Sequence, residues 1–200
     1  MNKLRMTLCA AAVAIAPLSP AVAAVFAVDA ANNSISGGTG LSTIALSAGQ
    51  IITVSASTSD LWSAGALPRY SDADGLVGPR IASPSDDSGP QDGTTVIGAN
   101  FGLPTINGFT APFGSLVGLV GTEYQLLGTN FTGSFTSAGT LQLFYWDTNN
   151  GDNFGTIAAN VASLEDGAVP EPATWLMMLA GFGAVGVAFR RRRVAITSAV

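Results

Sequence analysis

One short stretch of the chain concentrates side chains that could bind a metal ion. It runs from Asp147 to Asn153 and reads Asp-Thr-Asn-Asn-Gly-Asp-Asn. Calcium takes about six to eight oxygen ligands, and carboxylate and amide oxygens are the usual ones. The spacing differs from that of an EF-hand, whose glycine and terminal glutamate positions are not met. The stretch therefore indicates either a calcium site of another kind or a polar hairpin whose Asp and Asn side chains bond to their own backbone.

Two residue types that carry much of enzyme chemistry are scarce or missing. The chain has no histidine, and its one cysteine is Cys9, within the N-terminal apolar run. Without histidine, neither a Ser-His-Asp triad nor a typical zinc site can be built. Acidic pairs such as Asp86 and Asp87 are more typical of solvated loops, and no pattern places two acids on facing strands, as a glycosidase needs. We therefore expect a protein that is not an enzyme.

Short alternating runs predict the elements that would position this stretch. One strand ends at Asp147 and another restarts near Phe154, with a polar loop between them. Turn residues such as Gly121 and Asn149-Asn150-Gly151 separate the runs, and long helical periodicity is missing. Many short strands with frequent turns favour an all-β domain, a β-sandwich or jelly roll. The strands are expected at 51–56, 115–120, 124–127, 131–136, 141–146 and 157–161.

The predicted domain, residues 24–168, is strongly acidic. Residues 24–169 contain twelve Asp or Glu and two Arg, a net side-chain charge of −10. This charge disfavours nucleic acid and anionic lipid, and it is compatible with divalent cations or neutral sugars. Residues 58–114 are rich in Pro, Gly and Ser and show few strand patterns. We expect a long, loop-rich connection there, which is either functional or poorly ordered.

The N-terminus has the features of a secretory signal peptide. Lys3 and Arg5 precede an apolar run from Leu8 to Ala16, and Ala21-Val22-Ala23 supplies small residues at the expected cleavage point. We therefore expect a signal peptide over residues 1–23, cleaved after Ala23 or Ala24. The alternative is an uncleaved anchor, although the apolar run is short for a membrane span.

The C-terminus predicts a membrane helix. Ala173 to Phe189 is a run of 17 uncharged residues. At 1.5 Å per residue such a helix is about 25 Å long, just enough to cross a bilayer core. The four arginines that follow, Arg190, Arg191, Arg192 and Arg193, sit where the positive-inside rule places cytoplasmic charge. Residues before 170 are then expected outside, with residues 194–200 as a short cytoplasmic tail.

The residues around this helix resemble a known signal. Pro170-Glu171-Pro172, the apolar span and the arginine run occur in the order and spacing of the PEP-CTERM sorting domain, over residues 169–193. The resemblance implies recognition by an exosortase, a membrane-embedded cysteine protease-transferase, in bacteria that make exopolysaccharide. Two prolines around Glu171 favour an extended backbone that a protease cleft can hold. The alternative is an ordinary stop-transfer anchor after a Pro-rich linker.

The middle of the chain carries a second resemblance. The stretch from Leu141 to Gly155, together with residues 48–56 and 114–118, is similar to the calcium-dependent galactophilic lectins over roughly residues 41–162. In that family a strand-end Asp and a later Asp/Asn-Asn pair hold the calcium that binds sugar hydroxyls. The resemblance implies Asp147, Asp152 and Asn153 as calcium ligands. The loop here is shorter, and the sugar-binding histidine of the family is absent.

Together these features define two functional hypotheses. The first is an exported, exosortase-processed structural or interaction protein of the cell surface or extracellular matrix, with exopolysaccharide as a candidate partner and no role for nucleic acid. The second is a calcium-dependent carbohydrate-binding module. Both place the protein transiently in the cytoplasmic membrane with its C-terminus inside, and then at the cell surface or outside the cell.

Overall fold

The computed structural model describes residues 23–163, 176–177 and 179–183. The predicted signal peptide up to residue 22, the motif Pro170–Pro172, the arginines 190–193 and the tail 194–200 lie outside the described residues. The predicted membrane helix is described only at 176–177 and 179–183, which are helical. Within the described ranges, no helix is both long and apolar enough to cross a membrane.

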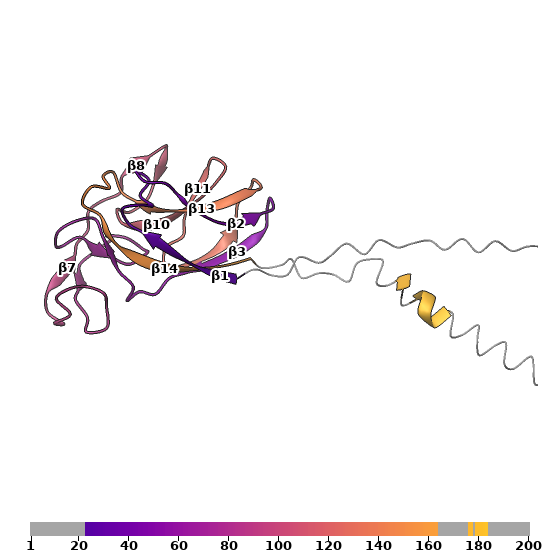
Figure 1. The fold of residues 1–200 in the computed structure, drawn as a ribbon, viewed down its shortest axis with the longest axis horizontal. Coiled ribbons are helices and arrows are strands. Elements are labelled where there is room, and N and C mark those ends of the chain that lie inside the picture. The colour runs from indigo at the N-terminus through magenta and orange to yellow at the C-terminus, as the bar shows by residue number, and fades with distance from the viewer. Residues whose placement is uncertain (1–22, 164–175, 178, 184–200) are drawn as a thin grey trace, which may run out of the picture.

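Residues 23–163 form a mostly-β domain with two main sheets (Figure 1). One sheet has the order β12-β3-β14-β4-β5, with β1 paired to β14, and the other has the order β11-β10-β13-β2. Two hairpins, β6-β7 and β8-β9, complete the strands. The long strands are β1 (Ala23–Asp29), β2 (Leu41–Leu46), β3 (Ile51–Ser55), β10 (Ser115–Val120), β11 (Glu123–Leu126), β12 (Asn130–Ser134), β13 (Gly139–Trp146) and β14 (Phe154–Ser163). The short ones are β4 (Trp62–Ser63), β5 (Tyr70–Ser71), β6 (Arg80–Ile81), β7 (Val96–Gly98), β8 (Thr105–Ile106) and β9 (Phe109–Thr110).

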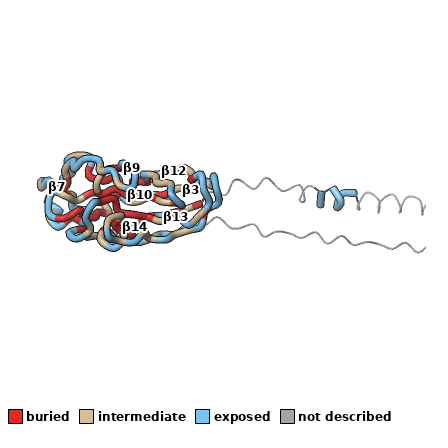
Figure 2. The backbone as a smooth tube through the Cα atoms, turned by 90° about the horizontal axis from the view of Figure 1, so that it is seen from above, coloured by how far each residue is buried: buried red, intermediate tan, exposed pale blue. Residues whose placement is uncertain are grey.

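The core lies between the two main sheets, as the buried residues along β10, β13 and β14 show (Figure 2). Strand β14 alternates as its sequence predicts, with Ile157, Ala159 and Val161 fully buried and the residues between them exposed. Strand β3 does the same with Ile52 and Val54. Each fully buried aliphatic side chain of this kind stabilises a fold by about 1.5–3 kcal/mol. These two sheets around one core are consistent with the sandwich predicted from alternation.

Strand β13 departs from the predicted alternation. Leu141, Leu143 and Tyr145 face the core as expected, but Phe144 and Trp146 on the opposite face are buried as well. The β8-β9 hairpin explains the second case, because Phe109 packs edge-on against Trp146 with ring centroids 5.5 Å apart. The outer face of this sheet is therefore covered as well.

Strands β1 and β2 were not among the predicted strands. Strand β1 pairs along its whole length with β14, from Ala23 opposite Ala162 to Asp29 opposite Thr156. Its first residues, Ala23 and Ala24, coincide with the predicted cleavage point. Beyond them, Val25, Phe26 and Val28 are residue types that strands favour.

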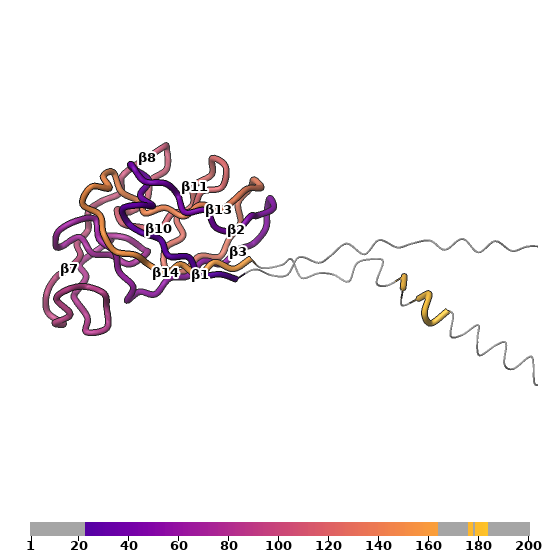
Figure 3. Tube along the Cα trace, viewed as in Figure 1, coloured from indigo at the N-terminus to yellow at the C-terminus, as the bar shows by residue number. Residues whose placement is uncertain are grey.

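Residues 58–114, called here the capping region, are structured. They contain the six short strands β4 to β9, and Figure 3 shows them gathered at the end of the domain away from residues 23 and 163 and over the outer face of β13. Leu61, Ala82 and Ile97 form a small core of their own. Trp62 and Leu76 belong instead to the main core. The capping region is thus rich in loops, as predicted, and it also has a packed interior.

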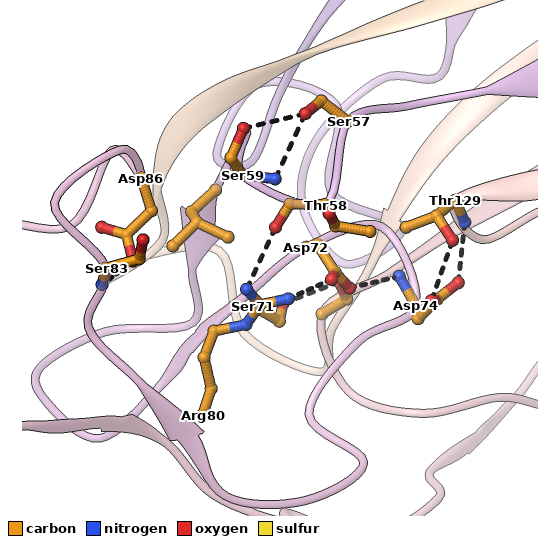
Figure 4. Close-up of polar contacts among 12 residues, drawn as sticks. Ser57, Thr58, Ser59, Ser71, Asp72, Asp74, Arg80, Ser83, Asp86 and Thr129 are labelled. Carbon is orange, nitrogen blue, oxygen red and sulfur yellow. Dashed lines mark hydrogen bonds and ion pairs between the residues drawn. The ribbon is translucent and has the colours of Figure 1, made fainter. Parts of the chain in front are cut away.

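Polar contacts hold the capping region together, and one pair of them joins it to the sandwich (Figure 4). The guanidinium of Arg80 forms an ion pair with the buried carboxylate of Asp72 and donates to the carbonyl of Thr58 at 3.0 Å. Asp74 accepts hydrogen bonds from the amide and the hydroxyl of Thr129, at 2.7 and 2.9 Å. The two acids of the Asp72-x-Asp74 pattern therefore hold the fold together.

Candidate functional site

The loop from Asp147 to Asn153 lies at the end of the domain opposite residues 23 and 163. Strand β14 sets this position, because it begins at Phe154 beside the loop and ends at Ser163 beside Ala23. A ten-residue strand is about 33 Å long. The loop therefore faces away from the point where the chain continues toward the predicted sorting motif.

A pocket of about 160 Å³ opens between this loop and the capping region. Asp147 and Asp152 come from the loop and Arg69 from the β4–β5 connection. Phe101 and Phe113 supply an apolar wall. The complete lining consists of Ala64, Arg69, Phe101, Phe113, Asp147, Thr148, Asn149 and Asp152. Two of the three predicted calcium ligands therefore line one pocket, and the capping region forms its other side.

Asp147 follows directly on strand β13 and is 5% exposed. Its Oδ1 accepts hydrogen bonds from the amides of Thr148, at 2.6 Å, and Asn149, at 3.4 Å. Burial raises the pKa of this carboxyl above 3.8, although the hydrogen bonds from Thr148, Asn149 and the Asn153 side chain oppose that shift. A buried carboxylate of this kind gains from a cation more than a solvated one does.

Asp152 is held from two sides. Its Oδ2 lies 3.2 Å from Nη1 of Arg69, and its Oδ1 accepts a hydrogen bond of 2.8 Å from the side-chain amide of Asn149. Both members of the ion pair are partly solvated, with 39% and 46% of their side chains exposed. Arg69 is 83 residues away along the chain, so nothing local in the sequence indicates this pairing.

Asn153 is the third predicted ligand, and it is 8% exposed. Its Nδ2 donates to the carbonyl of Ala30 at 3.3 Å, but its Oδ1 is buried and has no hydrogen-bond partner. Leaving a buried acceptor unpaired costs about 1–3 kcal/mol. The side chain that hydrogen-bonds to Asp147 thus carries an unsatisfied oxygen, although it does not itself line the pocket.

The phenol of Tyr145 is a further unsatisfied group that the sequence did not single out. Its hydroxyl is buried without a hydrogen-bond partner, and its ring packs edge-on against Trp62 at 4.5 Å. Burial, followed by the negative charges of Asp147 and Asp152, raises the pKa of this phenol well above its usual range. Tyr145 is therefore a neutral neighbour of the two acids.

The donor set fits a hard cation. Asp147 and Asp152 supply carboxylate oxygens, and the unpaired Oδ1 of Asn153 supplies an amide oxygen, which together match the chemistry that calcium prefers. Among the residues that the structure describes, no group of three or more His, Cys, Asp or Glu could hold a metal. A site here would therefore depend on amide and backbone oxygens beside its two acids.

A second pocket, of about 230 Å³, lies along residues 70–80 and is lined by Asp72, Asp74 and Arg80. Its charged groups are already paired, Asp72 with Arg80 and Asp74 with Thr129. Burial raises the pKa of Asp72 in spite of the opposing hydrogen bond from the Asp74 amide and the charge of Arg80. This pocket serves the packing of the capping region.

Comparison with known proteins identifies the C-terminal segment. Residues 168–193 match the PEP-CTERM protein-sorting motif, which confirms the predicted sorting signal. Such a motif marks an exported protein that an exosortase processes. Among solved structures, the N-terminal domain of EclA, a PllA-like lectin, is similar, with 26% identity, a TM-score of 0.44, and coverage of 70% of this chain and 95% of that chain. No curated protein matches the chain in sequence.

Proposed function

We propose that the β domain is a calcium-dependent saccharide-binding module, carried to the cell surface or the extracellular matrix by its sorting motif and acting without catalysis. The observation that carries this proposal is the Asn153 side chain, which hydrogen-bonds to the buried Asp147 carboxyl and whose own buried Oδ1 has no partner. Asp147, Asp152 and Asn153 would hold the ion. A bound calcium ion supplies a positive charge on which sugar hydroxyls can bind.

Calcium added to the purified exported protein tests the ion site. A ligand that binds only the folded state stabilises it by about 2.7 kcal/mol at a hundredfold excess over Kd. We expect millimolar calcium to raise the melting temperature of the native protein and a chelator to reverse the rise. Asp147→Asn should abolish the response. Glu123→Gln removes a carboxylate far from the pocket and should leave it unchanged. If calcium leaves the melting curve of the wild type unchanged, the proposed calcium site is wrong.

The Arg69–Asp152 ion pair favours a second candidate function. Since Arg69 and the Asn149 amide already bond to Asp152, the loop could instead be a self-satisfied hairpin of a purely structural surface protein. In that case Asp152→Asn should destabilise the protein with or without calcium by the same amount. Under the calcium proposal, the difference between wild type and variant grows when calcium is present.

The sorting proposal is tested in the producing cell. Replacing Pro170, Glu171 and Pro172 with alanine should make a membrane-bound precursor accumulate at the expense of a shorter form that lacks Arg190–Arg193. Immunoblots of membrane and extracellular fractions measure the ratio. If the ratio does not change, or if the mature protein retains the arginines, the segment acts as a plain anchor.

A further inference from the structure

Arg69 is the one described basic residue that lines the pocket with Asp147 and Asp152. Its Nη1 donates to the carbonyl of Ala64 and to Oδ2 of Asp152, both at 3.2 Å. Its guanidinium carbon lies 4.9 Å from the centre of the Phe101 ring. These contacts from three residues fix a long side chain whose freedom would otherwise have to be lost on ligand binding. The guanidinium is thus held in place while 39% of the side chain stays exposed.

The guanidinium retains unused donors. An arginine has five N–H groups, and within residues 23–163 the Nε and Nη2 groups of Arg69 donate to no protein atom. The planar fork of N–H groups matches the two oxygens of a carboxylate. Arg80, the other basic residue of the domain, already forms an ion pair with the buried Asp72. Arg69 is therefore the position at which this acidic domain can accept an anion.

The rest of the pocket is suited to a sugar ring. Phe101 and Phe113 stand edge to face with ring centroids 6.3 Å apart, and both line the pocket next to Arg69. An aromatic wall can cover the apolar C–H face of a pyranose. The pocket carries one positive and two negative side chains, a net charge of −1. With a divalent cation at the two acids, that charge becomes +1, which favours an anionic ligand.

We propose that Arg69 makes this pocket selective for acidic saccharides, that is, for sugars that carry a carboxylate such as hexuronic acids. This inference rests on the proposed saccharide-binding function and specifies its ligand. It also departs from the expectation drawn from net charge, which favoured neutral sugars, because the local charge of the pocket differs from that of the whole domain. The carboxylate would bind to the unused edge of the Arg69 guanidinium while the ring lies against Phe101.

A matched pair of monosaccharides tests this selectivity. The exported protein in calcium is titrated by calorimetry with methyl galacturonoside and with methyl galactoside, which differ only in the carboxylate. A hydrogen bond to a charged group corresponds to about a tenfold or larger difference in affinity. We expect the wild type to prefer the galacturonoside by at least about tenfold. Arg69→Gln should lose this preference, and Arg69→Lys should keep only part of it because an ammonium lacks the planar fork.

Two controls separate failure of this inference from failure of the proposed function. Leu103→Ala, in the same connection as Phe101 and 65% exposed, should leave the preference unchanged. The calcium-induced rise in melting temperature is measured for every variant and should persist in Arg69→Gln. If calcium raises stability but the wild type binds the neutral sugar as tightly, or binds neither sugar, the inference about Arg69 is wrong and the ion site stands. If calcium has no effect and neither sugar binds, the proposed function itself fails.

Discussion

The two halves of this domain are stabilised in different ways. In the sandwich, strands such as β3 and β14 bury every second residue against the facing sheet. In the capping region the strands are two or three residues long, and buried polar groups such as Ser63, Asp72 and Ser88 take the place of a continuous apolar face. Because the sandwich repeats the same pattern of buried residues along several strands, it should tolerate the loss of a single contact. The second half depends on individual contacts, so each of them should matter more.

The largest expected effect is at Trp62, where the two halves meet. Its side chain is fully buried, and its Nε1 donates to the carbonyls of Gly114 and Asp72, at 2.8 and 3.2 Å. Trp62→Ala should lower the free energy of unfolding by about 4 kcal/mol, because it leaves a cavity and unpaired carbonyls. Urea denaturation measures the loss. The exposed variant Leu103→Ala serves as the control, and a loss at Trp62 no larger than the control's would show that the capping region is only loosely attached.

The second effect concerns the buried ion pair. Arg80→Ala leaves the Asp72 carboxylate without its cation and should cost about 3 kcal/mol near neutral pH. Burial raises the pKa of Asp72 above 3.8 and Arg80 opposes that shift, so the variant should have a still higher folded-state pKa. The folded variant then binds the proton more tightly than the unfolded chain does. Its deficit should therefore shrink as the pH falls through that folded pKa toward 3.8.

Unfolding of Arg80→Ala at a series of pH values between about 7 and 5 measures this dependence. The matched comparison is Arg69→Gln, which removes a partly solvated pair and should cost less than about 1 kcal/mol. A deficit of Arg80→Ala that stays constant over the pH range would contradict the role assigned to Asp72.

A smaller effect is expected at the pocket between the two halves. Burial raises the pKa of Asp147, so protons should compete with calcium there at a higher pH than at a solvated aspartate. The calcium-induced rise in melting temperature should begin to decline, as the pH falls, at a pH above 3.8. Melting curves recorded with and without calcium at each pH separate this calcium-induced rise from the effect of pH on the protein alone. A rise that persists unchanged below pH 3.8 would place the ion elsewhere.

The smallest effect is expected at the exposed contact between Asp74 and Thr129. Asp74→Ala removes two hydrogen bonds, of 2.7 and 2.9 Å, to the sandwich. Because both groups can bond to water instead, the loss should be about 1 kcal/mol. Thr129→Val removes only the hydroxyl contact and should cost less than Asp74→Ala. The opposite order would mean that the Thr129 hydroxyl stabilises the fold through something other than its bond to Asp74.

Much of the sandwich could be predicted from the sequence, because alternation in a strand is a local property. The expected strand at 115–120 is β10 itself, and the alternation of Ile157, Ala159 and Val161 in β14 matches the observed burial. The polar loop from Asp147 to Asn153 and the C-terminal sorting motif could also be predicted, because each depends on residues close together in the chain. Strand β1 was missed because it begins at the predicted cleavage point, although its Val25, Phe26 and Val28 are residue types that strands favour.

The other wall of the pocket was decided by tertiary structure alone. Arg69 reaches Asp152 across 83 residues, and Phe101 and Phe113 come from connections whose composition predicted only loops. The burial of Trp146 on the outer face of β13 has the same origin, because it depends on Phe109 of the capping region. Residue patterns specify which side chains share a face of one strand. Contacts between distant segments depend on how the whole chain closes, so only the folded domain brings the acidic loop and an arginine into one pocket.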